Sequence, residues 1–299
     1  MKAPTLILSL AIAASVVPAY AQSPNTEQSF HSASRQSTEE IEDIGEIREV
    51  GEGDPKSVPE PLPELPDKFR FSLSTRAQYT SNAQLSGSHS SSDFLFFPTL
   101  EAGYHTELKH GFSFDIAARL ESGLYAKYDE RGFIGYSATT TLDWRPKANA
   151  PRIFIGAEPY RYDSFDTGDL LTQAVGLSIG TDHGIAFNSG NSMAFMGYNF
   201  THYLSDPSKD ERGAHRAIVG VTHTIRPQLY GQLFYAFQHD EYTDVDRDDN
   251  RHVVGLSFTY QVNRNFFTTL SGSFIDNDSS QDRASYQSAG AALQFTFQY

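Results

Sequence analysis

Residues 112–128 read FSFDIAARLESGLYAKY, with large apolar side chains at alternate positions and mostly polar ones between them. Ile116 and Leu120 fall on one face of an extended chain, whereas Asp115 and Arg119 fall on the other. A strand in a soluble sheet typically has about five or six residues, whereas crossing a bilayer takes about nine to eleven tilted residues. Length and alternation together predict a strand that crosses a membrane with its apolar face toward lipid.

The same pattern recurs from Phe69 to the end of the sequence, in segments separated by clusters of Gly, Asn, Asp and Pro. The segments lie near residues 69–79, 92–106, 112–128, 132–145, 152–163, 170–186, 192–204, 214–225, 228–240, 251–262, 266–276 and 285–299. Their number is even, as in bacterial single-chain barrels, and closure of such a sheet leaves no free edge. We therefore predict an all-β fold, a closed antiparallel transmembrane β-barrel of about twelve strands.

The connections between the segments alternate in length. Every second one is tight, as in LKHG at 108–111 and NSGN at 188–191, and the others tend to be longer and more polar, as in DPSKDERG at 206–213. Outer-membrane barrels have short turns on the periplasmic side and long loops outside. The pattern predicts that both ends of the barrel domain face the periplasm.

The amino-terminal residues predict export. Lys2 precedes an apolar stretch over residues 6–17 and then Ala19-Tyr20-Ala21, a small-x-small cleavage pattern, so residues 1–21 are interpreted as a signal peptide. The alternative, a membrane-spanning helix, is disfavoured because the stretch is short, and no later stretch approaches the roughly twenty apolar residues that such a helix needs. We expect the mature protein in the outer membrane of a Gram-negative cell.

Residues 22–67 differ in composition from the barrel segments. They contain twelve acidic and three basic residues and are rich in Ser, Glu and Pro, which predicts a disordered acidic periplasmic tail before a barrel over residues 68–299. Ile41, Ile44 and Ile47 recur at helical spacing, so a short amphipathic helix over residues 38–50 is the alternative to a solvated linker. Such a helix would bind the barrel or a periplasmic partner.

The sequence ends in AALQFTFQY, with Phe295, Phe297 and Tyr299 on one face of the last segment. This ending resembles the carboxy-terminal signal by which outer-membrane barrels are handed to the barrel-assembly machinery. The resemblance implies that these three residues form an assembly signal and that this machinery is a partner.

A second resemblance lies at the start of the barrel domain. In FSLSTRAQYTSNAQLS (71–86) and DFLFFPTLEAGYHTEL (93–108), Tyr79 and Asn82 form an aromatic-x-x-Asn turn, and Pro98 lies in the strand that follows. These segments look like the opening of β-barrel porin-like proteins of Gram-negative outer membranes. The resemblance implies a barrel and names no mechanism.

Strand alternation also assigns the charged residues that face the barrel interior. The predicted pore-lining residues are Arg70, Arg76, Glu101, Asp115, Arg119, Glu121, Lys127, Asp143 and Glu158. Mixed signs on the first five segments predict ion pairs along one wall. The opposite wall is expected to be neutral and polar, with Ser178, Thr222, Gln232, Gln238, Ser257, Gln294 and Thr296.

Catalytic chemistry has weak support in the sequence. His202, His223 and His239 are the candidates for a barrel enzyme, but none has a Ser or acidic partner at the spacing of a known motif. We expect no catalytic residue, no enzymatic activity and no cofactor. The sequence contains no cysteine, which excludes thiolate sites, and its net charge of −14 argues against a nucleic-acid partner.

Two acidic segments raise the question of a cation site. Asp244, Asp246 and Asp248 imitate the start of a calcium loop, but Asp249 replaces the required Gly and Gly255 replaces the bidentate Glu. A neighbouring segment contains Asp276, Asp278 and Asp282. The departures from the calcium motif favour solvated loops. Joint binding of divalent cations by the two segments is the alternative, and no metal site is assigned.

Two functional hypotheses remain. The first is a monomeric, passive channel for small hydrophilic solutes, surrounded by outer-membrane lipid and lipopolysaccharide. The second is a non-conducting structural or export-accessory barrel, for example in polysaccharide secretion, whose acidic tail recruits a periplasmic partner.

Overall fold

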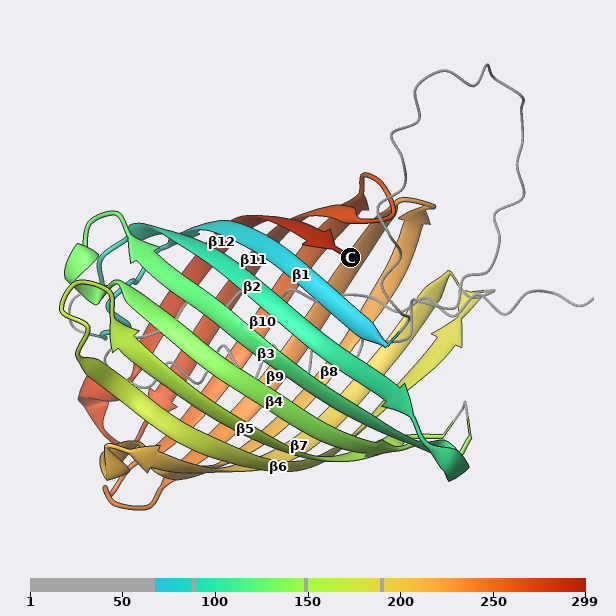
Figure 1. The fold of residues 1–299 in the computed structure, drawn as a ribbon. Helices are drawn as coiled ribbons and strands as arrows, with labels where there is room; N and C mark the ends of the chain where they lie inside the picture. The colour runs from blue at the N-terminus through green and yellow to red at the C-terminus, as the bar shows by residue number, and fades with distance from the viewer. Residues whose placement is uncertain (1–67, 88–89, 148–149, 189–190) are drawn as a thin grey trace, which may run out of the picture.

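The computed structural model describes residues 68–87, 90–147, 150–188 and 191–299, which form a closed antiparallel β-barrel (Figure 1). Each strand pairs with its neighbours in sequence, and β1 pairs with β12 to complete the ring. The strands are β1 (Phe69–Thr80), β2 (Asp93–Glu107), β3 (Phe112–Tyr125), β4 (Phe133–Trp144), β5 (Arg152–Ser164), β6 (Leu170–Phe187), β7 (Ser192–Asp206), β8 (Arg212–Arg226), β9 (Leu229–Tyr242), β10 (Asp248–Gln261), β11 (Phe266–Ser279) and β12 (Tyr286–Gln298). The predicted all-β class, closed barrel and twelve strands are confirmed.

The largest differences from the predicted strand boundaries lie at one end of the barrel. β3 ends at Tyr125 rather than at residue 128, because a 3-10 turn over Asp129–Arg131 forms the connection to β4. β8 begins at Arg212 rather than at residue 214, and β10 begins at Asp248 rather than at residue 251. Both strands start early because cross-strand pairing extends into residues that the sequence pattern assigns to polar loops.

The two rims of the barrel have different connections. The turn rim carries the β2–β3, β4–β5, β6–β7, β8–β9 and β10–β11 connections and the ends of β1 and β12, and the loop rim carries the others. In the β2–β3 turn, Gly111 has a φ of 77°, and a Cβ there would overlap the carbonyl oxygen of Arg145, so only glycine fits. The placement of the turn rim in the periplasm stays a prediction.

The outer face of the barrel carries an apolar band that lies between two belts of aromatic residues. Ile179, Val219 and Leu256 are exposed midway along their strands. Exposed aromatic side chains flank this band toward the loop rim (Tyr79, Phe94 and Tyr136) and toward the turn rim (Phe69, Phe112 and Trp144). An apolar band between aromatic girdles is the surface that a bilayer solvates.

Residues 1–67 lie outside the described part of the chain. The predicted signal peptide, acidic tail and helix over residues 38–50 fall there and stay predictions. Among the described residues, no helix is long and apolar enough to cross a membrane.

The contact between β1 and β12 closes the barrel. Cα partners run from Ser72 and Gln298 to Thr80 and Gly290. Beyond the last pair, the backbones of Phe71 and Tyr299 exchange two hydrogen bonds of 2.8 Å. The other two residues of the predicted assembly signal, Phe295 and Phe297, lie on the outer face, where Phe295 stacks on Phe266 with ring centroids 6.3 Å apart.

We predict that Tyr299→Ala lowers the yield of folded barrel in the outer membrane. The substitution keeps the backbone hydrogen bonds to Phe71 and removes only the terminal ring. The measurement is heat-modifiable gel mobility after membrane fractionation. Gln298→Ala, on the opposite face of the same strand, is the matched control, and equal yields for the two variants would contradict an assembly role for Tyr299.

Candidate functional site: the charged lumen

A network of charged side chains lines the inner face of β2, β3 and β5. Arg119 on β3 donates to Glu101 Oε2 on β2 from Nη2 at 3.0 Å and from Nε at 3.3 Å. Tyr162 on β5 donates its hydroxyl proton to Glu121 Oε1 at 2.7 Å. The side chains of Arg119 and Glu101 are 6 % and 15 % exposed, so the pair is largely removed from solvent. A charge buried to this extent needs a partner, and these contacts supply it.

A second group of ion pairs lies on the same wall, nearer the turn rim. Asp115 Oδ1 accepts from Arg70 Nη1 at 3.1 Å, and Asp115 Oδ2 lies 2.7 Å from His105 Nδ1. Arg152 lies between two carboxylates, 3.5 Å from Asp143 and 2.7 Å from Asp182. The ion pairs expected on the first five strands therefore exist, and β6 extends them through Asp182.

The opposite wall is charged, and the predicted neutral wall is wrong. Arg212, Arg216 and Arg251 face inward on β8 and β10, together with Asp240 and Asp249. Arg212 Nε donates to Asp240 Oδ1 at 3.3 Å, and Arg251 Nη2 lies 3.7 Å from Asp240 Oδ2. Arg216 and Asp240 already have inward parity in the sequence. Arg212 is the first residue of β8 and Arg251 is the fourth residue of β10, and both follow polar loop sequence.

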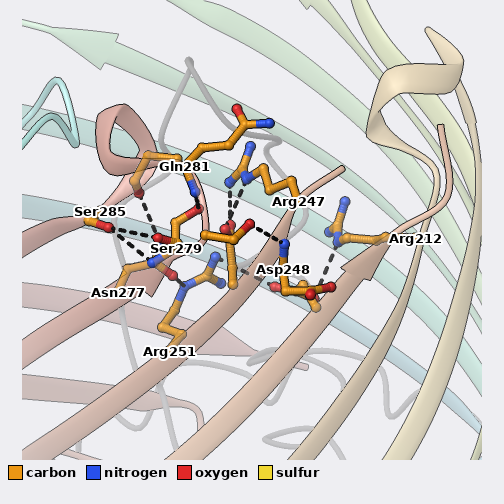
Figure 2. A network of polar contacts seen from close by, with 12 residues as sticks. Arg212, Arg247, Asp248, Arg251, Asn277, Ser279, Gln281 and Ser285 are labelled. Carbon is orange, nitrogen blue, oxygen red and sulfur yellow. Dashed lines mark hydrogen bonds and ion pairs between the residues drawn. The ribbon is translucent and has the colours of Figure 1, made fainter. Parts of the chain in front are cut away.

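Polar contacts join this wall to the loop rim across β10, β11 and the β11–β12 connection (Figure 2). Arg251 Nε donates to Asn277 Oδ1 at 3.2 Å, and Asn277 Nδ2 donates to the carbonyl oxygen of Ala284 at 3.0 Å. Arg247, in the β9–β10 loop, forms an ion pair with Asp249. Burial opposes the Arg247 charge, but the hydrogen bond and charge of Asp249 prevail and raise the pKa of Arg247 above its ordinary value. The guanidinium therefore stays charged at the rim.

The β1–β2 connection folds into the barrel at the loop rim. Asn82 and Leu85 are 1 % and 3 % exposed. Asn82 Nδ2 donates to the carbonyl oxygens of Ser86 and Gln287, both at 3.0 Å, which joins this loop to β12. Leu85 packs against inward-facing apolar side chains of β9–β12, namely Phe234, Ala236, Val253, Ile275 and Tyr286. The loop therefore narrows the lumen at this rim.

Buried aromatic side chains further fill the loop half of the interior. The cluster on β2–β8 contains Leu95, Phe97, Tyr125, Phe133, Tyr160, Tyr162 and Tyr203, packed with Ala83 of the β1–β2 loop. Two arginines contact these rings: Arg76 lies 4.2 Å from the centroid of Phe97, and Arg212 lies 4.5 Å from that of Tyr203. The loop half is thus more tightly packed than the turn half, where Ser72, Ser74, Thr139 and Thr141 keep partial exposure.

Among the predicted pore-lining residues, Lys127 alone lies off the strands. It follows the end of β3, and its Nζ donates to the carbonyl oxygen of Ser92 at 2.8 Å. The other eight lie on inward-facing strand positions: Arg70, Arg76, Glu101, Asp115, Arg119, Glu121, Asp143 and Glu158. All eight side chains belong to the inner face of the barrel wall, and their role in lining a pore stays a prediction.

The candidate catalytic histidines lie on the outer face. His223 Nδ1 is 2.9 Å from Ser192 Oγ near the turn rim, a Ser–His contact that sequence spacing did not indicate. His202 Nε2 lies 4.0 Å from Glu211 Oε1, and His239 Nδ1 lies 3.0 Å from Asn250 Oδ1. Ser192 is 4 % exposed and therefore poorly placed to attack a substrate. Among the described residues, no group of three or more His, Asp or Glu side chains is arranged to hold a metal ion.

Comparison with known proteins agrees with this architecture. Residues 212–299 match the family described as "Putative beta-barrel porin 2". An outer membrane channel from Pseudomonas putida F1 shares the fold with a TM-score of 0.53 and 11 % identity, over 84 % of this chain and 100 % of that one. The chain has the fold of an outer-membrane β-barrel. The KdgM porin is similar over 76 % of this chain and 98 % of that one, with a TM-score of 0.45 and 9 % identity. No curated protein matches the sequence.

We predict that Arg119→Glu shifts the ion selectivity of the barrel toward cations. The substitution adds negative charge beside Glu101 and Glu121 on a wall already rich in carboxylates. The measurement is the reversal potential of the refolded barrel in a salt gradient. The double variant Arg119→Glu/Glu101→Arg restores an ion pair and should return the selectivity toward that of the wild type.

A substitution at the next residue tests which face of β3 points inward and which points outward. Leu120 faces outward and is 40 % exposed, so Leu120→Arg places a charge in lipid at a cost of about 2–4 kcal/mol near the midplane. Its yield of folded barrel should fall, whereas the Arg119→Glu/Glu101→Arg variant should assemble. Equal assembly defects in both variants would show that the inward and outward faces of β3 have been assigned wrongly.

Proposed function

We propose that the barrel is a monomeric, passive channel for small hydrophilic solutes. The observation that carries this proposal is the distribution of inward-facing charges around the wall. Carboxylates predominate on β2–β6, where Arg119 and Arg152 lie among Glu101, Asp115, Glu121, Asp143, Glu158 and Asp182. Arginines predominate on the remaining wall, where Arg212, Arg216 and Arg251 on β8 and β10 and Arg70 and Arg76 on β1 lie with Asp240 and Asp249.

Walls of opposite sign produce an electric field across the lumen. Such a field orients dipolar solutes and favours polar over apolar ones, because a dipole aligned with the field replaces part of the hydration that the solute loses. A barrel with a purely structural role has no need of opposed charged walls. The arrangement therefore favours a path for hydrated, polar molecules.

The β1–β2 loop supports the restriction to small solutes. The loop packs between the aromatic cluster on β2–β8 and the apolar side chains of β9–β12. A solute that enters from the loop rim must pass beside Asn82 and Leu85. The size limit of the channel would accordingly lie near this rim rather than at the turn rim.

The same packing gives the second candidate function its support. Phe133, Tyr162, Ala83 and Leu85 are between 0 % and 3 % exposed, which is the burial of a packed core. A barrel filled at its loop half would serve as a structural or export-accessory element. In that case residues 22–67, interpreted as an acidic periplasmic tail, would recruit the partner. We assign no catalytic role to either form, since Ser192 is buried and its contact with His223 lies outside the lumen.

Planar-bilayer recording of the refolded mature chain separates the two candidates. We predict stepwise ionic conductance, and the same conductance for a variant that lacks residues 22–60. A correctly folded barrel that shows no steps in either form would refute the channel and favour the structural role. Steps that appear only after the deletion would show that the amino-terminal segment blocks the lumen.

A substitution in the loop tests where the narrow point lies. Asn82→Ala removes the side-chain hydrogen bonds to Ser86 and Gln287 and should release the loop from β12. We predict a larger single-channel conductance and a higher size cut-off in liposome swelling with sugars. Asn265→Ala, which removes a side-chain hydrogen bond to Gln298 at the turn rim, is the matched control and should leave both unchanged.

A further inference from the structure

Four histidines lie on the outer face of adjacent strands near the loop rim. They are His202 on β7, His215 on β8, His239 on β9 and His252 on β10. His215 and His239 are direct cross-strand partners with ring centroids 6.5 Å apart. We call His215, His239 and His252 the histidine row. On the side toward the middle of the barrel, the exposed outer-face side chains next to them are apolar or aromatic, as at Val219, Leu233 and Val254.

Each imidazole of the histidine row is held through its Nδ1 atom. The partners are the Tyr198 hydroxyl for His215 at 2.8 Å, Asn250 Oδ1 for His239 at 3.0 Å and the Tyr235 hydroxyl for His252 at 2.8 Å. Because Asn250 Oδ1 is an acceptor, His239 donates from Nδ1. The three Nε2 atoms make no hydrogen bond within the described residues. Each of the three imidazoles is therefore fixed through Nδ1 and keeps its Nε2 atom available for a ligand.

The position of the row relative to the apolar band defines what it meets in a membrane. On the side toward the turn rim it adjoins the aromatic residues Tyr198, Phe200, Tyr235 and Phe237, beyond which the exposed side chains are apolar. Aromatic girdles lie at the level where acyl chains give way to headgroups. The histidine row consequently lies among the headgroups of the leaflet at the loop rim.

Charged groups on neighbouring strands limit which headgroup would be attracted. Asp276 on β11 is the register partner of His252, and Glu241 and Asp248 lie one outward-facing position nearer the loop rim. Glu211 is 4.0 Å from His202, which is why His202 is not included in the row. Because these carboxylates repel an anion, the imidazoles would attract one only while they are protonated.

We propose that the histidine row binds the phosphate groups of the phosphorylated glycolipid in the outer leaflet, the lipid A part of lipopolysaccharide. Each protonated ring would donate its Nε2 proton to a phosphate oxygen in a charge-assisted hydrogen bond. A shared phosphate would also offset the repulsion between the His215 and His239 charges. Because only a protonated ring carries a positive charge and donates from both nitrogens, binding should be stronger at acidic than at alkaline pH. This proposal rests on the loop rim facing outward and does not depend on whether the lumen conducts.

Native mass spectrometry of the full mature chain tests the proposal, with bisphosphorylated lipid A and dephosphorylated lipid A as the two probes. We predict that bisphosphorylated lipid A binds about tenfold more tightly at pH 5.5 than at pH 8, a difference of about 1.4 kcal/mol. The dephosphorylated lipid should show little pH dependence. Equal binding of the two lipids at pH 5.5 would overturn the proposal without any variant.

The triple variant His215→Gln/His239→Gln/His252→Gln should lose the pH dependence. His223→Gln is the matched control, since His223 is also an exposed outer-face histidine but lies near the turn rim. If the triple variant does not fold, His239→Gln alone should reduce the effect. Retention of the full pH dependence in a folded row variant would overturn the proposal. A row variant that changes oligomeric state without a change in lipid binding would also overturn the proposal. It would indicate that the row forms an interface between two copies of the chain.

Discussion

The β1–β12 contact is the interaction on which the rest of the structure depends. A bilayer offers no hydrogen-bond partners, so each backbone group of a membrane-spanning sheet must pair with a neighbouring strand. Pairing from Ser72 to Thr80 along β12, together with the two hydrogen bonds between Phe71 and Tyr299, removes the last two edges. Closure also separates an inside from an outside, and only then do the two faces of each strand meet different solvents.

Inside the barrel, the enclosed space makes charge pairing necessary. Arg119 and Glu101, or Arg212 and Asp240, lie where solvent is scarce, and loss of either partner would leave a buried charge at a cost of about 3–5 kcal/mol. The pairs within each wall hold the side chains in place. The imbalance between the walls gives the lumen its field. The β1–β2 loop adds an apolar restriction at one rim, so polarity and size would be selected at different depths.

The outer face of the wall follows the same alternation with a different consequence. Next to lipid, an uncompensated polar side chain is costly, so polar residues concentrate where headgroups replace acyl chains. The histidine row occupies that level on β8–β10, while Ser192 and His223 lie near the opposite rim. Adjacent residues of one strand therefore face different surroundings: on β8, Arg216 faces the lumen and His215 faces the lipid.

The sequence by itself determined the features that depend on local periodicity. Alternation with a period of two sets strand facing, strand number and closure, because a slip of one residue would put every polar side chain into lipid. For this reason Arg119 and Leu120 were assigned to opposite faces correctly, as were Phe295 and Phe297 to the outer one. Lys127 lies beyond the end of β3 at Tyr125, and parity alone does not mark where a strand stops.

Only the tertiary structure decided which residues meet across the barrel. The hydrogen bond from Asn82 to Gln287, the packing of Leu85 against β9–β12 and the contact between Arg212 and Asp240 join residues on different strands and loops. Such contacts depend on register and on how closure brings distant segments together, and neither is encoded in a window of a few residues. The arginines of β8 and β10 therefore lie together on one side of the lumen only in the closed barrel.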